Sequence, residues 1–399
     1  MNFLIYLINE GLSKVLPFIT ILIVAKHIDA EAFGELTLYF IVFELLIILI
    51  SNNITATTRI DYFKLSFSNY VESKSTHLVV SFFIFLCVLV VGLFFSNMSY
   101  LFLSMLSLSA FLRTVSYYHL SNLQCKEDAK SYGISNVIYL LSMNGLFVIL
   151  ILLDYGINSW FYGILFGSFT QFLYSLMHIK KLSLFIYEKD IILKKDNLLK
   201  EFKYGLIFIP QAVGFWMKFG IDRVLLVYFT STLIVGYYMF AYQLLLPIVI
   251  LGTVINLYLT PKINKLLKLN SIQLLKKNLI LFSFLIIVFS VFIYFGANFV
   301  ISSFYYEKYM VSLEYLPYMI ISIVFQSIMM VYLNIFYYID KKEFVSKFIF
   351  ITALFQIIGG MLIINISDVF GLMIFNIIYA SLSLLFIINI FNRRFNVIA

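Results

Sequence analysis

The stretch that decides the fold runs from Phe202 to Pro247 and reads FKYGLIFIPQAVGFWMKFGIDRVLLVYFTSTLIVGYYMFAYQLLLP. It holds two apolar runs, each long enough to cross a bilayer as a helix that rises about 1.5 Å per residue. Lys218, Asp222 and Arg223 interrupt the first run. Each charge in the hydrocarbon costs about 2.5–3.5 kcal/mol on insertion scales, so charges at this depth predict a site that faces protein or water.

The composition of the whole chain fits a membrane protein. Of its 399 residues 62% are hydrophobic and only 12% are charged, whereas soluble domains contain about 25% charged residues. Apolar runs of about 20 residues recur along the chain and are continuous rather than alternating, which favours helices over a β-barrel. The sequence therefore predicts an all-α polytopic membrane protein.

Twelve spans are predicted, about six in each half of the chain. They cover residues 3–25, 36–57, 77–96, 99–121, 134–153, 158–178, 204–229, 233–257, 278–297, 315–337, 346–365 and 370–391. The longest connection separates two predicted six-helix lobes, 1–180 and 203–399, joined by a linker at 181–202.

A weak internal similarity supports this division. Residues Ala32–Leu36, which open the second span, resemble Ile234–Tyr238, which open the eighth. Two such lobes around a central cavity are typical of alternating-access transporters.

The lysines and arginines of the loops predict the orientation. Almost all of them follow the even-numbered spans or lie in the tail, whereas the opposite side carries only Lys26 and Lys308. By the positive-inside rule the basic side is cytoplasmic, which places both termini inside. This asymmetry also explains the sequence pI of about 9.1 without a nucleic-acid partner.

Two acid–base pairs are expected within single spans. Glu10 and Lys14 are four residues apart, as are Lys218 and Asp222, so each pair shares one helix face. One interpretation is that the pairs are neutralised couples that hold helices together. The other is that Lys14 and Lys218, on equivalent helices of the two lobes, direct cations into the central cavity.

Two arginines add to the positive charge of the predicted spans. Arg113 has no acidic residue near it in the sequence, and Arg223 points about 100° away from Asp222 around the helix. Arg113 could instead extend to the membrane surface, and Arg223 could form a structural ion pair with Asp222. Because arginine binds phosphate bidentately, an excess of cations predicts an anionic substrate such as a pyrophosphate head group.

The candidate residues fall into two groups. The predicted substrate-binding residues are Lys14, Arg113, Lys218 and Arg223, and the predicted charge-pairing or gating residues are Glu10, Glu44 and Asp222. The sequence contains no nucleotide-binding loop, no zinc-ligand spacing and no Ser/His/Asp arrangement in a plausible loop. We therefore expect a transporter rather than an enzyme, without catalytic residues, metal or cofactor, driven by a proton or sodium gradient or by the supply of substrate.

Three segments resemble a known family, the oligosaccharide flippases of polysaccharide biosynthesis (O-antigen type). They belong to the superfamily that also holds the multidrug and toxic-compound exporters. The segments are GLSKVLPFITILIVAKHIDAEAFGELTLYF, the Tyr-Gly-x-x-x-x-Pro, Asp-Arg and Gly-x-Tyr pattern within 202–247, and FYYEKYMVSLEYLPYMIIS.

The resemblance implies a function. Members move undecaprenyl-pyrophosphate-linked oligosaccharides, such as O-antigen or capsule repeat units, from the inner to the outer leaflet of the bacterial inner membrane. Cavity cations, here the four named above, would meet the pyrophosphate or acidic sugars. The implied partners are the lipid-linked oligosaccharide, membrane lipids, and the polymerase and chain-length proteins of the same pathway.

Two other functions stay open at this point. A cation-coupled drug or metabolite antiporter of the same superfamily would need acidic residues in the first lobe, where Glu10 and Glu44 are the membrane-buried candidates. A membrane glycan polymerase would need a sizeable outward loop with catalytic charges, and the outward side here is nearly bare of charge.

Overall fold

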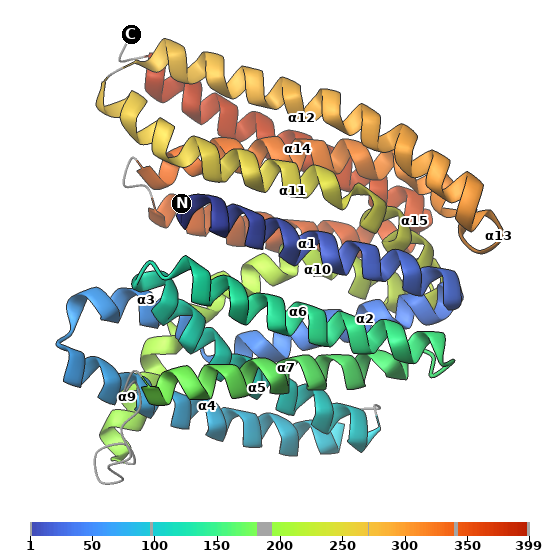
Figure 1. Cartoon of the computed structure of the whole chain (residues 1–399). Coiled ribbons are helices and arrows are strands. Elements are labelled where there is room, and N and C mark those ends of the chain that lie inside the picture. Colours follow the sequence, from blue (N-terminus) through green and yellow to red (C-terminus); the bar gives the residue numbers. More distant parts are fainter. Residues whose placement is uncertain (1, 96–98, 182–193, 270, 339–341, 397–399) are drawn as a thin grey trace. The chain divides into compact units, whose positions relative to one another are not determined.

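The structure is a computed structural model that describes residues 2–95, 99–181, 194–269, 271–338 and 342–396. Within these ranges the regular structure is helical and includes no strand (Figure 1). The helices are α1 Asn2–His27, α2 Ala30–Ser51, α3 Ile54–Lys64, α4 Phe67–Phe95, α5 Tyr100–Cys125, α6 Ala129–Leu152, α7 Asn158–Lys181, α9 Lys195–Leu206, α10 Ile209–Phe229, α11 Thr232–Lys268, α12 Ile272–Val300 with a π-helical end at Ile301–Tyr305, α13 Tyr306–Tyr309, α14 Ser312–Tyr338 and α15 Lys342–Asn396.

Several of these helices meet the requirements for crossing a membrane. Seven helical segments among the described residues are long and apolar enough: Ala30–Lys64, Phe67–Gly92, Ala129–Leu152, Thr232–Asn256, Ile272–Tyr309, Ser312–Leu333 and Lys347–Arg393. The chain is therefore a multi-pass, all-helical membrane protein, as its composition predicts. The number of twelve spans stays a prediction.

Helix α15 contains a break where the sequence predicts a gap between two spans. Ser367 and Asp368 have non-helical backbone angles, and Asp368 lies in the left-handed region with φ 55°. The break falls between residues 365 and 370, which are the predicted end of one span and start of the next.

The chain divides into two compact units. Unit 1 comprises Met1–Ile28 and Tyr39–Trp216, and unit 2 comprises Asp29–Leu38 and Met217–Ala399. Helices α2 and α10 each contribute residues to both units. Most of the predicted linker, 182–193, lies outside the described residues, and the division into six and six spans stays a prediction.

Each unit is a bundle of long helices packed along their length. In unit 1, α7 packs on α5 and α6, α4 packs on α5, and α1 packs on α6. In unit 2, α14 packs on α11, α12 and α15. In a long helix the backbone N–H and C=O groups bond to one another within the helix, so apolar helices of this kind can form bundles in a bilayer.

Two glycines allow two helices to cross at very short distance in unit 2. A Cβ atom added at Gly34, near the start of α2, would overlap the carbonyl oxygen of Thr232 at the start of α11. A Cβ atom added at Gly236 in α11 would overlap the carbonyl oxygen of Ala30. Each glycine thus faces the residue four positions before the other glycine, so the contact has approximate two-fold symmetry. The two segments with weak internal similarity are the segments that meet here.

Aromatic side chains surround this glycine crossing. The rings of Phe33 and Phe240 are 6.1 Å apart in an edge-to-face arrangement, and Tyr309 stacks on Phe240 at 4.1 Å. The Ser312 hydroxyl donates a hydrogen bond of 2.8 Å to the carbonyl oxygen of Tyr237. These contacts involve the third segment of the family resemblance, which runs from Phe304 to Ser322.

Replacing Gly236 with alanine should disrupt the crossing. The new methyl group meets a backbone atom that cannot rotate away, so we expect a loss of about 1–3 kcal/mol in unfolding free energy. Thermal unfolding in detergent, followed by circular dichroism, measures the loss. Gly296→Ala is the matched control, because its Cβ meets nothing within 4 Å and alanine favours helix by about 1 kcal/mol. Equal midpoints for the two variants would contradict the account.

Candidate functional site

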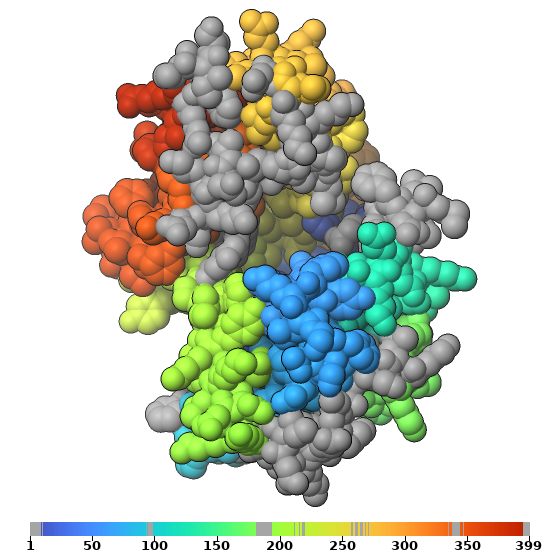
Figure 2. Space-filling model, turned by 90° about the vertical axis from the view of Figure 1, so that its left-hand side faces the viewer, coloured from blue at the N-terminus to red at the C-terminus, as the bar shows by residue number. Residues whose placement is uncertain are grey.

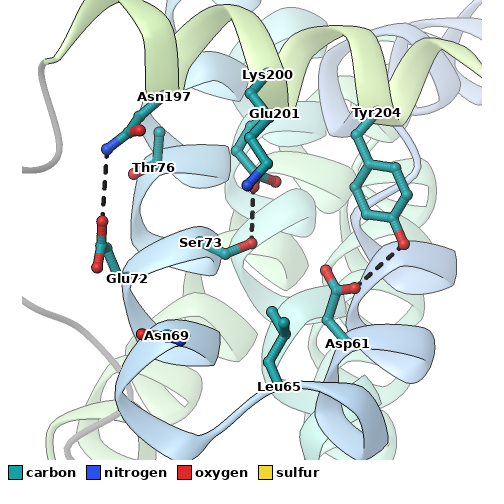
Figure 3. Close-up of a pocket in the computed structure, with 10 residues that line it drawn as sticks. All are labelled: Asp61, Leu65, Asn69, Glu72, Ser73, Thr76, Asn197, Lys200, Glu201 and Tyr204. Carbon is teal, nitrogen blue, oxygen red and sulfur yellow. Dashed lines mark hydrogen bonds between the residues drawn. The ribbon is translucent and has the colours of Figure 1, made fainter.

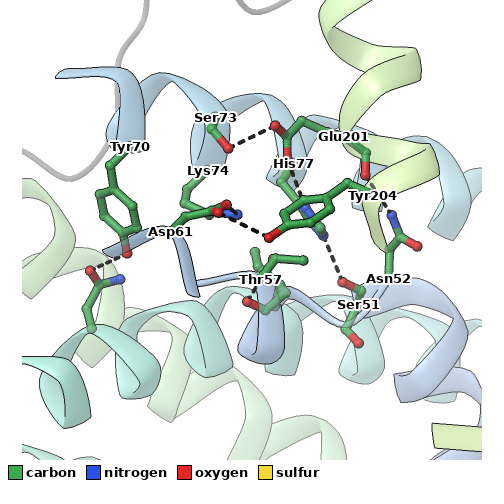
Figure 4. A network of polar contacts seen from close by, with 12 residues as sticks. Ser51, Asn52, Thr57, Asp61, Tyr70, Ser73, Lys74, His77, Glu201 and Tyr204 are labelled. Atoms are coloured by element: carbon green, nitrogen blue, oxygen red, sulfur yellow. Dashed lines mark hydrogen bonds and ion pairs between the residues drawn. The ribbon is translucent and has the colours of Figure 1, made fainter. Parts of the chain in front are cut away.

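A buried ion pair lies between α3 and α4 in unit 1. The Lys74 Nζ atom is 2.7 Å from Oδ2 of Asp61, and the Lys74 side chain has no solvent exposure. The Tyr204 hydroxyl, from α9, donates a 3.2 Å hydrogen bond to Oδ1 of Asp61 (Figure 4). The consecutive helices α3 and α4 and the sequence-distant helix α9 are therefore joined through one carboxylate.

Glu201 of α9 forms a second set of contacts next to this pair. Its Oε2 is 3.4 Å from Nδ1 of His77, and its Oε1 accepts a 2.8 Å hydrogen bond from the Ser73 hydroxyl. Burial raises the pKa of the Glu201 carboxyl, but the His77 hydrogen bond and the charge of Lys74 outweigh this and leave that pKa below its usual value. Glu201 is therefore ionised at neutral pH, and its charge holds α9 against α4.

A third contact fixes α9 at the junction of α2 and α3. Asn52 has a left-handed backbone with φ 44°, and its side-chain Nδ2 donates to the carbonyl oxygens of Glu201 and Phe202. A Cβ atom at Gly205 would overlap the Asn52 side chain. The Tyr204-Gly205 dipeptide of the sequence pattern thus has a structural role: the tyrosine bonds to Asp61 and the glycine makes room for Asn52.

A polar pocket of about 370 Å³ opens beside these contacts (Figure 3). Its lining consists of Asp61, Leu65, Asn69, Glu72, Ser73, Thr76, Asn197, Lys200, Glu201 and Tyr204. Among the described residues no group of three or more His, Cys, Asp or Glu could hold a metal ion. The carboxylates of the pocket instead bond across it, as when Asn197 donates to Glu72 at 3.4 Å.

Sequence reasoning missed this network. Lys74 falls between the second and third predicted spans, 36–57 and 77–96, and so belongs to a predicted cytoplasmic loop; in the structure it lies inside α4 and is fully buried. A usable signal was present, because Tyr70, Lys74, His77 and Ser81 recur at helical spacing and are all buried. The partner of His77, Glu201, lies 124 residues further along the chain, which spacing alone could not reveal.

Of the predicted substrate-binding residues, Arg113 has the most distinctive surroundings. It is buried, with 8% exposure, between α5, α6 and α7 of unit 1. Its Nη1 donates to the side-chain oxygen of Gln171 and its Nη2 to the Tyr117 hydroxyl at 2.9 Å, while its Cζ lies 3.7 Å from the ring centroid of Tyr139. Arg113 therefore does not extend to the surface, and the partners described here are neutral. Its Nε has no hydrogen-bond partner in the described structure.

Arg223 and Asp222 lie together in unit 2. The Arg223 Nε is 3.9 Å from Oδ1 of Asp222, and the Arg223 Cζ lies 4.8 Å from the ring centroid of Tyr242. The Tyr238 hydroxyl donates a 2.6 Å hydrogen bond to Oδ2 of Asp222. The Asp-Arg and Gly-x-Tyr parts of the sequence pattern are thus in direct contact, through Asp222 and Tyr238.

The remaining candidates are only partly described. Lys14 is half-buried on α1 and Glu44 is exposed on α2. The side chains of Glu10 and Lys218 lie outside the described residues. The predicted pairs Glu10–Lys14 and Lys218–Asp222 therefore stay predictions, as does the convergence of the four cations on one cavity.

Comparison with known families identifies the chain. Residues 1–267, well over half of the sequence, match the family described as "Polysaccharide biosynthesis protein". The chain belongs to this polysaccharide biosynthesis family. The match confirms the predicted family and covers the first two of the three sequence segments. No curated protein sequence matches the chain.

Solved structures share the fold of this family member. It is similar to a lipid II flippase, MurJ, in an inward closed conformation, with a TM-score of 0.74, 16% identity, and 96% of this chain and 86% of the other covered. An inward-facing multidrug resistance MATE family transporter gives a TM-score of 0.69 at 16% identity, covering 98% and 94%. A transporter from Pyrococcus furiosus Vc1 gives 0.62 at 15% identity, covering 99% and 94%. The last two are described as members of the MOP superfamily, so the chain has a MOP-superfamily transporter fold.

The buried ion pair can be tested by removing one partner. Lys74→Met leaves the Asp61 carboxylate buried without its cation, so we expect unfolding in detergent to become easier by about 3–5 kcal/mol. The double variant Lys74→Met/Asp61→Asn removes both charges and should recover most of this loss. If the double variant loses as much unfolding free energy as the two single variants lose together, the pair does not act as a unit.

Proposed function

We propose that this protein is a flippase that moves an undecaprenyl-pyrophosphate-linked oligosaccharide, an O-antigen or capsule repeat unit, from the inner to the outer leaflet of the bacterial inner membrane by alternating access. Membership of the polysaccharide biosynthesis family supports a polysaccharide pathway. The MurJ structure, whose protein is described as a lipid II flippase, has the same fold. No catalytic residue is assigned, because the proposed work is translocation.

The observation that carries the proposal is the environment of Arg113. A buried guanidinium is costly unless it is paired, and neutral hydrogen bonds and ring contacts compensate only part of the cost. Gln171, Tyr117 and Tyr139 are its described partners, and none of them is an anion at neutral pH. An anionic group of a substrate would supply the missing charge, and a pyrophosphate matches the two-pronged geometry of arginine.

The other proposed substrate-binding residues differ from Arg113 in their charge balance. Arg223 already has the Asp222 carboxylate 3.9 Å away, so a substrate anion would compete with an existing partner. We therefore expect Arg113 to contribute more to substrate affinity than Arg223. Lys14 and Lys218 complete the proposed set, and Glu10, Glu44 and Asp222 are proposed to pair with these cations or to gate them.

The fold is also that of drug exporters, so a cation-coupled antiporter is the second candidate function. The observation in its favour is the similarity to a multidrug resistance MATE family transporter. We also propose that either activity is coupled to a proton or sodium gradient, because the sequence has no nucleotide-binding loop.

The proposal is tested by measuring surface polysaccharide in a bacterial strain. The strain lacks its own flippase but makes a matching lipid-linked glycan. The wild-type chain should restore surface glycan. Arg113→Gln should reduce the rate of its appearance by about ten- to a hundredfold, the loss expected for one or two charge-assisted hydrogen bonds, and Arg223→Ala should reduce it less. Both variants should insert normally, because removing a buried charge eases insertion.

The matched control is Arg393→Gln, the same kind of change at an exposed arginine near the end of α15. It should transport like the wild-type chain. Wild-type glycan levels with Arg113→Gln, at equal protein in the membrane, would remove Arg113 from the substrate site.

A further inference from the structure

Helix α9 presents different residues on opposite faces. At 100° per residue, Asn197, Glu201 and Tyr204 fall on one face, and all three contact α3 or α4. The network around Glu201 therefore fixes which way α9 is turned. By the same spacing, Leu199, Phe202 and Leu206 fall on the opposite side of the helix.

That outer face is apolar and exposed. Leu199, Phe202 and Leu206 occupy positions i, i+3 and i+7 and are 45%, 38% and 39% exposed. Figure 2 shows the green surface of residues near 200 beside the blue surface of residues near 60, at the face turned to the viewer. An exposed stripe of leucine and phenylalanine, on a helix whose other face packs on α3 and α4, indicates contact with a partner or with lipid.

Exposed lysines border the apolar stripe. Lys194 and Lys195 lie at the start of α9, and Lys203 follows one residue after Phe202. Phe63 and Phe67, at the neighbouring turn between α3 and α4, are also exposed. Large apolar side chains bordered by lysines are the pattern of a helix that lies in the plane of a membrane surface.

We propose that α9 lies in the interface of the cytoplasmic leaflet, with Leu199, Phe202 and Leu206 among the upper acyl chains, and binds the phosphate groups of anionic phospholipids. A leaflet of this charge attracts each nearby lysine by about 1 kcal/mol. The positive-inside pattern puts these lysines on the cytoplasmic side. The chain continues from α9 directly into α10, which carries the predicted seventh span. The inference does not depend on the substrate of the transporter.

The proposal has a mechanical consequence. The inner face of α9 is bonded to α3 and α4, and its outer face would be held by lipid, so α9 would be fixed on two sides. The start of α10 follows it after two residues. Anionic lipid is thus expected to stabilise the position at which the chain enters α10.

Fluorescence quenching in nanodiscs tests the proposal. Phe202→Trp adds a tryptophan on the outer face, and the parental protein, with Trp160 and Trp216, gives the background. The discs contain phosphatidylcholine brominated near the top of its chains, with or without phosphatidylglycerol. We expect the added fluorescence to be quenched, and more strongly when phosphatidylglycerol is present. Protein free of lipid-linked sugar excludes the substrate's own phosphate as the anion.

Charge reversal separates head-group binding from simple insertion. Lys195→Glu/Lys203→Glu, in the Phe202→Trp background, should abolish the extra quenching caused by phosphatidylglycerol. Lys126→Glu/Lys130→Glu reverses two exposed lysines at the α5–α6 turn of the same unit and should retain it.

Three results would overturn the proposal. One is quenching by aqueous iodide instead of bromolipid, which would place the outer face of α9 in water. Another is bromolipid quenching that does not respond to phosphatidylglycerol. The last is protection from both quenchers, which would indicate a protein partner or a second copy of the chain on this face.

Discussion

The ion pair between Lys74 and Asp61 is the contact on which the arrangement of α3, α4 and α9 depends. A fully buried ammonium requires a carboxylate at close distance, and Asp61 provides it while also accepting a hydrogen bond from Tyr204. About one turn further along α4, His77 forms a similar contact with the carboxylate of Glu201. Both pairs connect to α9, the helix that precedes α10 in the chain. They also leave Leu199, Phe202 and Leu206, on the opposite side of α9, exposed.

A steric constraint plays the corresponding part in unit 2. Gly34 and Gly236 allow α2 and α11 to approach until backbone meets backbone, and the aromatic rings of Phe33, Phe240 and Tyr309 fill the space around them. Most of the residues that define the sequence pattern of the family are thus residues that join helices.

The sequence predicted the class of fold, because continuous apolar runs can only be satisfied as helices in a bilayer. It also predicted the break near Asp368 and the family. It did not predict that Lys74 is buried, since a lysine outside an apolar run is normally counted as a loop residue. The neutral surroundings of Arg113 were equally hidden, because Gln171 and Tyr139 lie on other helices and only packing brings them together.

The central claim is that this protein moves a lipid-linked oligosaccharide across a membrane. The most direct measurement uses sealed vesicles that contain the purified chain and a fluorescent lipid-linked oligosaccharide, with a membrane-impermeant reagent outside that destroys exposed label. The account predicts that all of the label becomes accessible with the wild-type chain, and only the outer-leaflet half with Arg113→Gln or with empty vesicles. Label that stays half-protected in wild-type vesicles, while those vesicles transport a cationic dye against an ion gradient, would contradict the account and indicate a drug antiporter.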